Sequence, residues 1–194
     1  MLFRSKNPIY KIEQKVLKEL IKRVSYAMSA DEKRYVLNGL LVCLKDGKLT
    51  LVATDGRRLA LADQELDFPK SGEREFILPA KAVLELQRQL ADKDEVAFVV
   101  LENQILFQFG TTLIAAKMVE GNYPNYRQVI PAEAKERVTL ERELFLNSVR
   151  RVALLSSEKS NSVKLTFTKN NLEIAANTPD VGEAREAIPV QYKG

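Results

Sequence analysis

The sequence predicts an α+β fold in which one β-α-β-β-β unit occurs three times. Three observations predict it. Short strand-like triplets each lead into a helical pattern, three stretches of strand character follow each helix, and the helices begin near residues 13, 80 and 141. Recurrence of one supersecondary pattern at regular spacing is typical of a repeat architecture.

The first unit begins with the triplet Tyr10-Lys11-Ile12. A helix is expected over residues 13–28, where apolar residues recur at helical spacing and mark one buried face. Strands are expected over residues 36–44, 48–54 and 58–66. Asp46-Gly47 lies between the first two strands and is a tight hairpin signal.

The second and third units follow the same order. Phe76-Ile77-Leu78 precedes a helix expected over residues 80–91, and Pro79 suits the start of a helix because its missing N–H costs nothing there. Val138-Thr139-Leu140 precedes a helix expected over residues 141–156. The strands that follow these helices are expected over residues 95–100, 104–109, 112–119, 162–168, 171–177 and 183–192.

A longer repeat predicts the domain organisation. Residues of the first helix match residues of the third at one constant offset: Ile12, Val16, Leu17, Val24 and Ser29 correspond to Leu140, Leu144, Phe145, Val152 and Ser157. Two units therefore form one complete domain over residues 9–131, and the third unit begins a second, incomplete domain over residues 132–194. Residues 1–8 are expected to be non-native or a linker.

The composition restricts the chemistry of the chain. Histidine is absent and Cys43 is the only cysteine, which excludes an imidazole base, a Ser-His pair, a cysteine zinc site and an internal disulfide. We therefore expect no catalytic residue, no metal and no cofactor. No apolar run approaches the roughly 20 residues that span a bilayer, and no signal peptide is recognisable, so a cytoplasmic protein is expected.

Basic residues gather on the outer faces of two expected helices, and the net charge is +4. Lys15, Lys18 and Lys22 lie opposite the apolar stripe of the first helix, and Lys81 and Arg88 lie opposite that of the second. Like charges at this spacing repel one another by a few tenths of a kcal/mol per pair, which a bound polyanion would offset. The alternative is a solvated lysine face. No base-reading pattern is present, so contacts with nucleic acid are expected to be to phosphates.

One octapeptide resembles a family signature. Ala53-Thr54-Asp55-Gly56-Arg57-Arg58-Leu59-Ala60 is similar to the signature in the second domain of bacterial DNA polymerase III beta subunits, the DNA sliding clamps. On its own it is also compatible with a simple turn, because Asp-Gly favours one. Further similar segments occur in family order: residues 34–39, 76–81, 121–131, 154–159 and 174–177.

The resemblance implies a DNA-clamp fold, with helices on one side facing DNA and antiparallel sheets outside. In the family, six units per chain form three domains, and two chains close head-to-tail into a homodimeric ring. This chain carries three of the six units and is not expected to close a ring alone. The implied function is that of a processivity factor, which encircles duplex DNA and tethers the polymerase, raising its effective concentration. The implied partners are duplex DNA, the DNA polymerase III alpha subunit, the clamp-loader complex and other proteins with a clamp-binding motif.

The resemblance also implies two sets of site residues. Arg34 and Tyr35 stand in the family's DNA-contacting loop. A pocket for partner peptides would include Leu37, Thr54, Gly56, Arg57, Arg58, Leu59, Pro124, Gln128 and Val129. Two positions depart from the common pattern, since Arg57 stands where histidine is frequent and Gln128 where arginine is frequent.

Two other functions remain open from the residues alone. The first is a stand-alone nucleic-acid-binding module that uses the same basic helices without a ring. The second is a hydrolase in which Asp55 pairs with Glu65 or Asp67, as acid–base chemistry between two carboxylates requires. Tyr123 and Tyr126 are compatible either with the pocket or with a simple brace for the segment between the domains.

Overall fold

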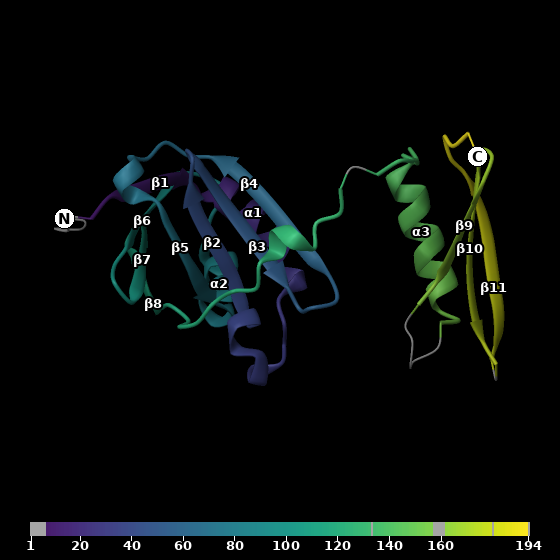
Figure 1. Cartoon of the computed structure of the whole chain (residues 1–194), viewed down its shortest axis with the longest axis horizontal. Helices are drawn as coiled ribbons and strands as arrows, with labels where there is room; N and C mark the ends of the chain where they lie inside the picture. Colours follow the sequence, from purple (N-terminus) through teal and green to yellow (C-terminus); the bar gives the residue numbers. More distant parts are fainter. Residues whose placement is uncertain (1–6, 133, 157–161, 180, 194) are drawn as a thin grey trace. The chain divides into compact units, whose positions relative to one another are not determined.

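The computed structural model describes residues 7–132, 134–156, 162–179 and 181–193. The chain divides into two compact units, Met1–Val129 and Ile130–Gly194, and each is described by itself (Figure 1). Residues 1–6, most of the segment expected to be non-native or a linker, lie outside the described residues.

The first unit contains two four-stranded antiparallel sheets and two helices (Figure 1). One sheet has the order β4-β3-β2-β5 and the other the order β1-β6-β7-β8. The helices are α1 (Gln14–Val24) and α2 (Ala80–Gln89). The strands are β1 (Ile9–Glu13), β2 (Gly39–Lys45), β3 (Lys48–Thr54), β4 (Leu59–Glu65), β5 (Arg74–Pro79), β6 (Glu95–Val100), β7 (Gln104–Phe109) and β8 (Thr112–Lys117).

The leading strand of each repeat completes the sheet of the other repeat. β1 pairs with β6, with Tyr10 opposite Phe98, and β5 pairs with β2, with Ile77 opposite Leu41. The two repeats therefore interlock through both sheets and share one core. This exchange explains why two β-α-β-β-β units form a single folded body.

Both helices pack against the same side of the sheets. α1 and α2 contact each other, and they lie behind the sheet β4-β3-β2-β5 in Figure 1. Their apolar faces bury Leu20, Val24 and Leu86 in a core that includes strands of both sheets. Successive side chains on a strand point to opposite faces, so Leu40 and Val42 of β2 join this core.

A second apolar cluster covers the opposite face of the sheet β4-β3-β2-β5. It consists of the buried residues Leu41, Cys43, Val52, Ile77 and Tyr126, and we call it the outer cluster. The segment after β8, which carries a short 3₁₀ turn at Tyr126–Gln128, crosses the front of the sheet in Figure 1. β2 is consequently buried on both faces, with only Lys45 exposed.

Within the first unit, two expected boundaries differ most from the structure. The helix expected over residues 13–28 ends at Val24 and continues only as a 3₁₀ turn. The strand expected from residue 36 begins at Gly39, because Glu32–Leu37 forms 3₁₀ turns. The Asp31 carboxylate accepts the backbone N–H of Lys33 and so caps the start of these turns.

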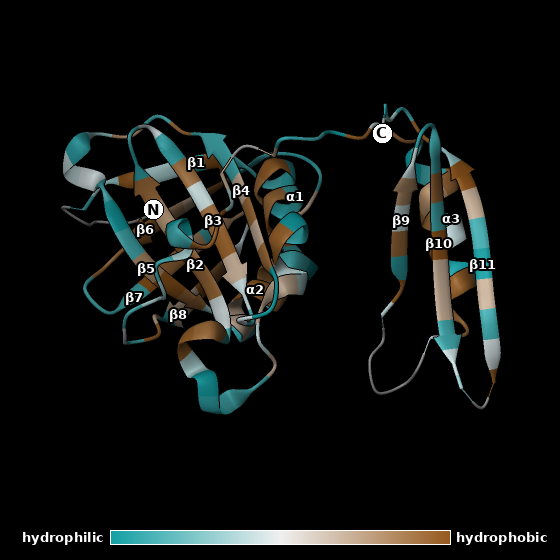
Figure 2. Cartoon of the chain, turned by 45° about the vertical axis from the view of Figure 1, so that its right-hand side comes forward, coloured by the Kyte–Doolittle hydropathy of each residue, from teal (hydrophilic) through white to brown (hydrophobic). Residues whose placement is uncertain are grey.

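The second unit is a three-stranded sheet with one helix packed on it. α3 (Arg142–Ala153) covers a sheet of order β11-β10-β9, formed by β9 (Lys164–Thr168), β10 (Asn171–Thr178) and β11 (Gly182–Pro189). Hydrophobic and hydrophilic residues alternate along β10 and β11, as expected for strands with one buried face (Figure 2). The leading strand expected at residues 138–140 is reduced to one bridge between Thr139 and Gln191.

Among the described residues, no helix is both long and apolar enough to span a membrane.

Candidate functional site

A cavity of about 300 Å³ opens on the outer face of the first unit. This volume is at the lower end of the roughly 300–1,000 Å³ that is usual for ligand pockets. Its walls are Leu37, Thr54, Gly56, Arg57, Arg58, Leu59, Pro124, Asn125, Tyr126 and Val129. The structure thus brings together every predicted pocket residue except Gln128, which does not line the cavity. We call this cavity the outer pocket.

The turn between β3 and β4 forms one wall of the outer pocket. The Thr54 hydroxyl accepts the N–H of Gly56 (3.0 Å) and donates to the carbonyl of Arg58 (2.7 Å). Gly56 has a φ of +85°, a conformation that glycine adopts at little cost. The wall is therefore a fixed turn, and a Cβ at Gly56 would lie 3.3 Å from Nη1 of Arg34.

Asp55 holds the same turn from its other side. One carboxylate oxygen accepts the backbone N–H groups of Arg57 (2.9 Å) and Arg58 (3.0 Å). The other oxygen lies 3.2 Å from Nε of Arg58. These hydrogen bonds to the charged form lower the pKa of Asp55, the backbone N–H groups contributing most.

Two tyrosines attach the opposite wall to the sheet. The Tyr123 hydroxyl accepts the backbone N–H of Thr54 at 3.0 Å, and burial raises the pKa of Tyr123 to about 12. Tyr126 is buried in the outer cluster and also lines the cavity. The Arg127 guanidinium stacks 4.7 Å from the centre of the Tyr126 ring. These tyrosines therefore brace the segment and shape the outer pocket at once.

Arg34 connects the 3₁₀ turns to the wall of the outer pocket. Its Nη1 donates to the carbonyl of Asp55 (2.7 Å), and its Nε donates to the carboxylate of Asp31 (3.2 Å). The neighbouring Tyr35 is 59% exposed. Arg34 therefore positions the turn of the outer pocket, a contact that the resemblance did not indicate.

The basic residues on the helices lie on the other side of the sheet. Lys15, Lys22 and Lys81 are exposed and have no ion-pair partner among the described residues. Lys18 lies 3.4 Å from Asp92. Arg88 pairs with Glu85, which raises the pKa of Arg88 and lowers that of Glu85. Two of the five predicted charges are thus neutralised locally, and the uncompensated basic face is narrower than the sequence indicates.

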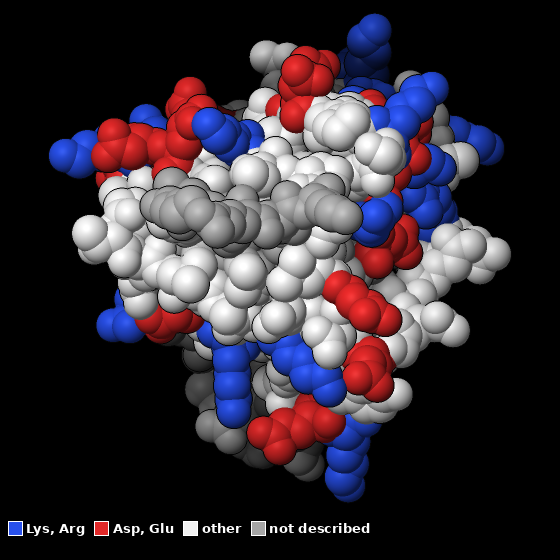
Figure 3. All heavy atoms as spheres, turned by 90° about the vertical axis from the view of Figure 1, so that its left-hand side faces the viewer, with Lys and Arg blue, Asp and Glu red and all other residues white. Residues whose placement is uncertain are grey.

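The face drawn in Figure 3 differs from the helix face. Acidic and basic side chains lie beside one another there, around a broad band of uncharged residues. A mixed surface of this kind gives little net attraction for a polyanion. Lys15, Lys22 and Lys81, which have no ion-pair partner among the described residues, are therefore better candidates for nucleic-acid contacts than the face in Figure 3.

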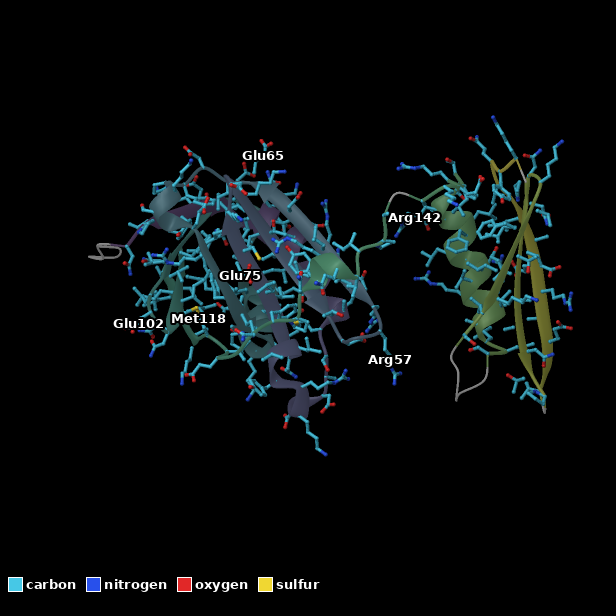
Figure 4. All side chains as sticks on the ribbon, viewed as in Figure 1. Arg57, Glu65, Glu75, Glu102, Met118 and Arg142 are labelled. Carbon is cyan, nitrogen blue, oxygen red and sulfur yellow. The ribbon has the colours of Figure 1, made fainter. Side chains whose placement is uncertain are left out.

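The predicted carboxylate pair does not form. Asp55 precedes β4, whereas Glu65 ends it and Asp67 follows it, so about six residue steps of strand, roughly 20 Å, separate Asp55 from both candidate partners. A larger cavity of about 530 Å³ lies elsewhere, between β5 and residues 118–123, and Figure 4 shows its residues Glu75, Glu102 and Met118. Within the part of the chain that the structure describes, no group of three or more acidic or cysteine side chains is arranged to hold a metal.

Comparison with protein families identifies the chain. The model of the DNA polymerase III beta subunit central domain matches residues 11–125, and that of the C-terminal domain matches residues 127–194. The chain belongs to the DNA polymerase III beta subunit family.

Individual relatives agree with this family assignment. The beta sliding clamp of Chlamydia pneumoniae is 36% identical over 178 residues, which are 92% of this chain and 49% of that protein. The beta sliding clamp of Pseudomonas aeruginosa is 36% identical over 186 residues, 95% of this chain and 51% of that protein. The chain therefore spans about half the length of these relatives.

Solved structures confirm the clamp fold. A crystal structure of the DNA polymerase sliding clamp from Pseudomonas aeruginosa superposes with a TM-score of 0.93 at 34% identity, covering 99% of this chain and 54% of that one. The sliding clamp of Bartonella birtlesii bound to griselimycin has a TM-score of 0.91 at 32% identity, covering 100% of this chain and 54% of that one.

Some residues of the beta subunit fold in this chain were not predicted as site residues. Asn125 lines the outer pocket, and the Arg58 guanidinium lies 5.6 Å from the centre of the Tyr26 ring. Tyr126, for which the sequence left open either the pocket or a brace, lines the outer pocket as well. Tyr126 carried a sequence signal, because it follows Pro124 within a segment that is similar to the family. Tyr26 carried none, since it lies at the end of the first helix, far from the turn in sequence.

Proposed function

We propose that this chain is part of a processivity factor of DNA replication, a sliding clamp that encircles duplex DNA and tethers the replicative polymerase. The outer pocket carries the proposal, because its apolar walls and accessible turn suit a short peptide with apolar anchors. The partners would be the DNA polymerase III alpha subunit, the clamp-loader complex and other proteins with a clamp-binding motif. The complete protein would act in the cytoplasm as a head-to-tail homodimeric ring.

The proposal assigns no covalent chemistry to the chain. Tethering works by raising the local concentration of a polymerase at the primer end, which requires binding sites and not catalytic groups. Residues 9–131 would be one complete clamp domain, and residues 132–194 would be the first half of the next. This division is compatible with the two compact units.

The nucleic-acid side of the proposal rests on the helices. Lys15, Lys22 and Lys81 would contact phosphates, with Lys18 and Arg88 contributing after exchange of their acidic partners. Arg34 and Tyr35 would contact the duplex from the 3₁₀ turns. Contacts with phosphates are insensitive to sequence, which suits sliding because no register is preferred.

Replacing Lys15, Lys22 and Lys81 together by glutamine is expected to weaken binding to duplex DNA in a salt-dependent way. Each phosphate contact releases about one counterion, so the magnitude of the negative slope of log K against log salt should decrease by about 3. Fluorescence polarisation with a labelled duplex at several salt concentrations measures this slope.

A matched variant controls for net charge. Lys45 and Lys48 are exposed on β2 and β3, and Lys70 is exposed at the start of a 3₁₀ turn, so none of them belongs to α1 or α2. Their replacement by glutamine removes the same charge. The slope should then stay within about 1 of the unmodified chain. An equal decrease in the magnitude of the salt slope in both triple variants would show that only the net charge matters. That result would contradict the proposed contact of the helix face with DNA.

A stand-alone nucleic-acid-binding module is the alternative function. The lysines of the helices would serve it equally well, but it gives no role to the outer pocket. Binding of DNA without any binding of apolar peptides would favour this alternative, whereas peptide binding at the outer pocket favours the clamp.

A further inference from the structure

The strand β9 of the second unit lacks a cover that the equivalent strand of the first unit has. In the first unit α1 packs mainly against β3 and β4, whereas β2 is contacted by α2, the helix of the other repeat. In the second unit α3 packs mainly against β10 and β11, the equivalents of β3 and β4 (Figure 2). Among the described residues, β9 therefore has no helix of another repeat beside it, as β2 has.

The side chains of β9 show this difference in their exposure. Counted back from the hairpin turn, Phe167 and Leu165 stand at the positions of Leu44 and Val42. Leu44 is 0% exposed and Val42 is 5% exposed. Phe167 is 40% exposed and Leu165 is 41% exposed. Phe167 lies opposite the buried Leu172, so these two apolar side chains of β9 are on the face of the sheet that carries α3.

The helix α3 shows the same difference along one side. Phe145 and Val149 correspond to Leu17 and Ile21 of α1 at the offset of the longer repeat. Leu17 and Ile21 are buried, whereas Phe145 and Val149 are only partly buried. We use the name open face for the four side chains of the second unit that are less buried than their equivalents: Phe145, Val149, Leu165 and Phe167.

In the first unit, the other repeat covers the equivalent positions. Leu17, Ile21 and Val42 border the same small interior space as Leu86 of α2 and Phe98 of β6. The cover is reciprocal, because β1 pairs with β6 of the second repeat while β5 pairs with β2 of the first. Each repeat thus gives and receives the same parts. A surface with this property is self-complementary, as in a dimer with two-fold symmetry.

We propose that the open face binds the open face of a second copy of this chain. The α3 helix of each copy covers β9 of the other. Residues 138–140, which a bridge between Thr139 and Gln191 joins to their own unit, pair with the free edge of β9 in the other copy. An unpaired strand edge readily accepts another strand. The inference does not depend on the outer pocket, so its failure would leave the proposed function unaffected.

A second copy is the occupant that the repeats favour. The repeat of the second unit matches the first repeat of the first unit along its helix, and that repeat is covered by a repeat of the same β-α-β-β-β order. The open face contains no charged side chain, so two identical faces meet without repulsion between like charges. Covering it removes apolar surface from water, which drives association.

Sedimentation velocity of the unmodified chain over a roughly hundredfold range of concentration tests the association. We expect a reversible equilibrium between monomer and dimer with no larger species, because an interface with two-fold symmetry closes at two copies. A monomer at every concentration would overturn the proposal. A series of trimers and larger oligomers would overturn it as well, since such growth requires two different surfaces.

Hydrogen exchange of the unmodified chain at the two ends of this concentration range locates the contact. Exchange should slow in β9 at high concentration, where the dimer is populated. The strand β4 is the matched control, because it is an edge strand of the first unit. Protection that appears in β4 and not in β9 would show that the copies associate through the first unit, contrary to the proposal.

A pair of variants tests the open face itself. Phe167→Glu should raise the dissociation constant of the dimer at least about tenfold, because each copy then buries an unpaired carboxylate. Val181→Glu is the control: Val181 is 66% exposed in the turn between β10 and β11 and is not part of the open face. That variant should stay within about twofold of the unmodified chain. Equal weakening in both variants would contradict the role of the open face.

Discussion

Replacing Leu59 by aspartate is expected to lower the affinity of the chain for a short peptide with apolar side chains at least about tenfold. Leu59 begins β4, lines the outer pocket and packs against the outer cluster. A carboxylate at this position would remove an apolar contact and place an unpaired charge against the anchors of the peptide, which costs more than the lost contact alone. Fluorescence polarisation with a fluorescein-labelled apolar peptide that has no charged side chain isolates this effect, because such a peptide has no charge to be repelled.

Leu61 provides a matched control on the same strand. It lies two residues further along β4, on the same face, is 41% exposed and does not line the outer pocket. Leu61→Asp should leave the affinity for the peptide within about twofold, since surface substitutions away from a site have small effects. Equal losses of peptide affinity in Leu59→Asp and Leu61→Asp would mean that the peptide binds across the sheet and not in the outer pocket.

Replacing Leu86 by alanine is expected to lower the free energy of unfolding of the first unit by about 2–5 kcal/mol. Leu86 is fully buried on α2 and belongs to the core that both helices share with both sheets. The substitution removes buried methyl groups and leaves a cavity that close-packed neighbours fill only in part. Urea denaturation followed by circular dichroism measures the loss of stability.

Leu84 is the corresponding control on the same helix. It is 57% exposed, two residues before Leu86, and its replacement by alanine should change the free energy of unfolding by at most about 0.5 kcal/mol. Hydrogen exchange should become faster throughout the first unit of the Leu86→Ala variant and stay unchanged in β10 and β11. Similar losses in the free energy of unfolding of Leu86→Ala and Leu84→Ala would contradict the assignment of Leu86 to the buried face of α2.

The element order was predictable from the sequence, but the pairing of strands was not. Hydrophobic periodicity located all three helices and the strands that follow them. The exchange of β1 and β5 depends on contacts between residues far apart in the chain, such as Tyr10 with Phe98, and no local pattern encodes them. The start of β2 was misplaced because the apolar pair Val36-Leu37 reads as strand, whereas the Asp31 cap favours a 3₁₀ turn.

The outer pocket was predictable mainly through resemblance. A turn at Asp55-Gly56 follows from turn chemistry alone, but its meeting with Pro124 and Val129 requires the folded chain. The ion pairs of the basic residues on α1 and α2 were likewise only partly predictable from the sequence. The Arg88–Glu85 pair follows from i, i+3 spacing, whereas the contact of Lys18 with Asp92 joins residues that only tertiary packing brings together.

The central claim is that the turn at residues 54–59 and the segment at residues 124–129 form one binding site for apolar peptides. The most direct test is a titration of the ¹⁵N-labelled chain with the uncharged apolar peptide, followed by ¹H–¹⁵N correlation spectra. We expect the largest shift changes in Thr54, Gly56, Leu59 and Val129, with the signals of α1 and α2 nearly unchanged. Shift changes centred on the helices, or on the larger cavity beside Glu75 and Glu102, would contradict the assignment.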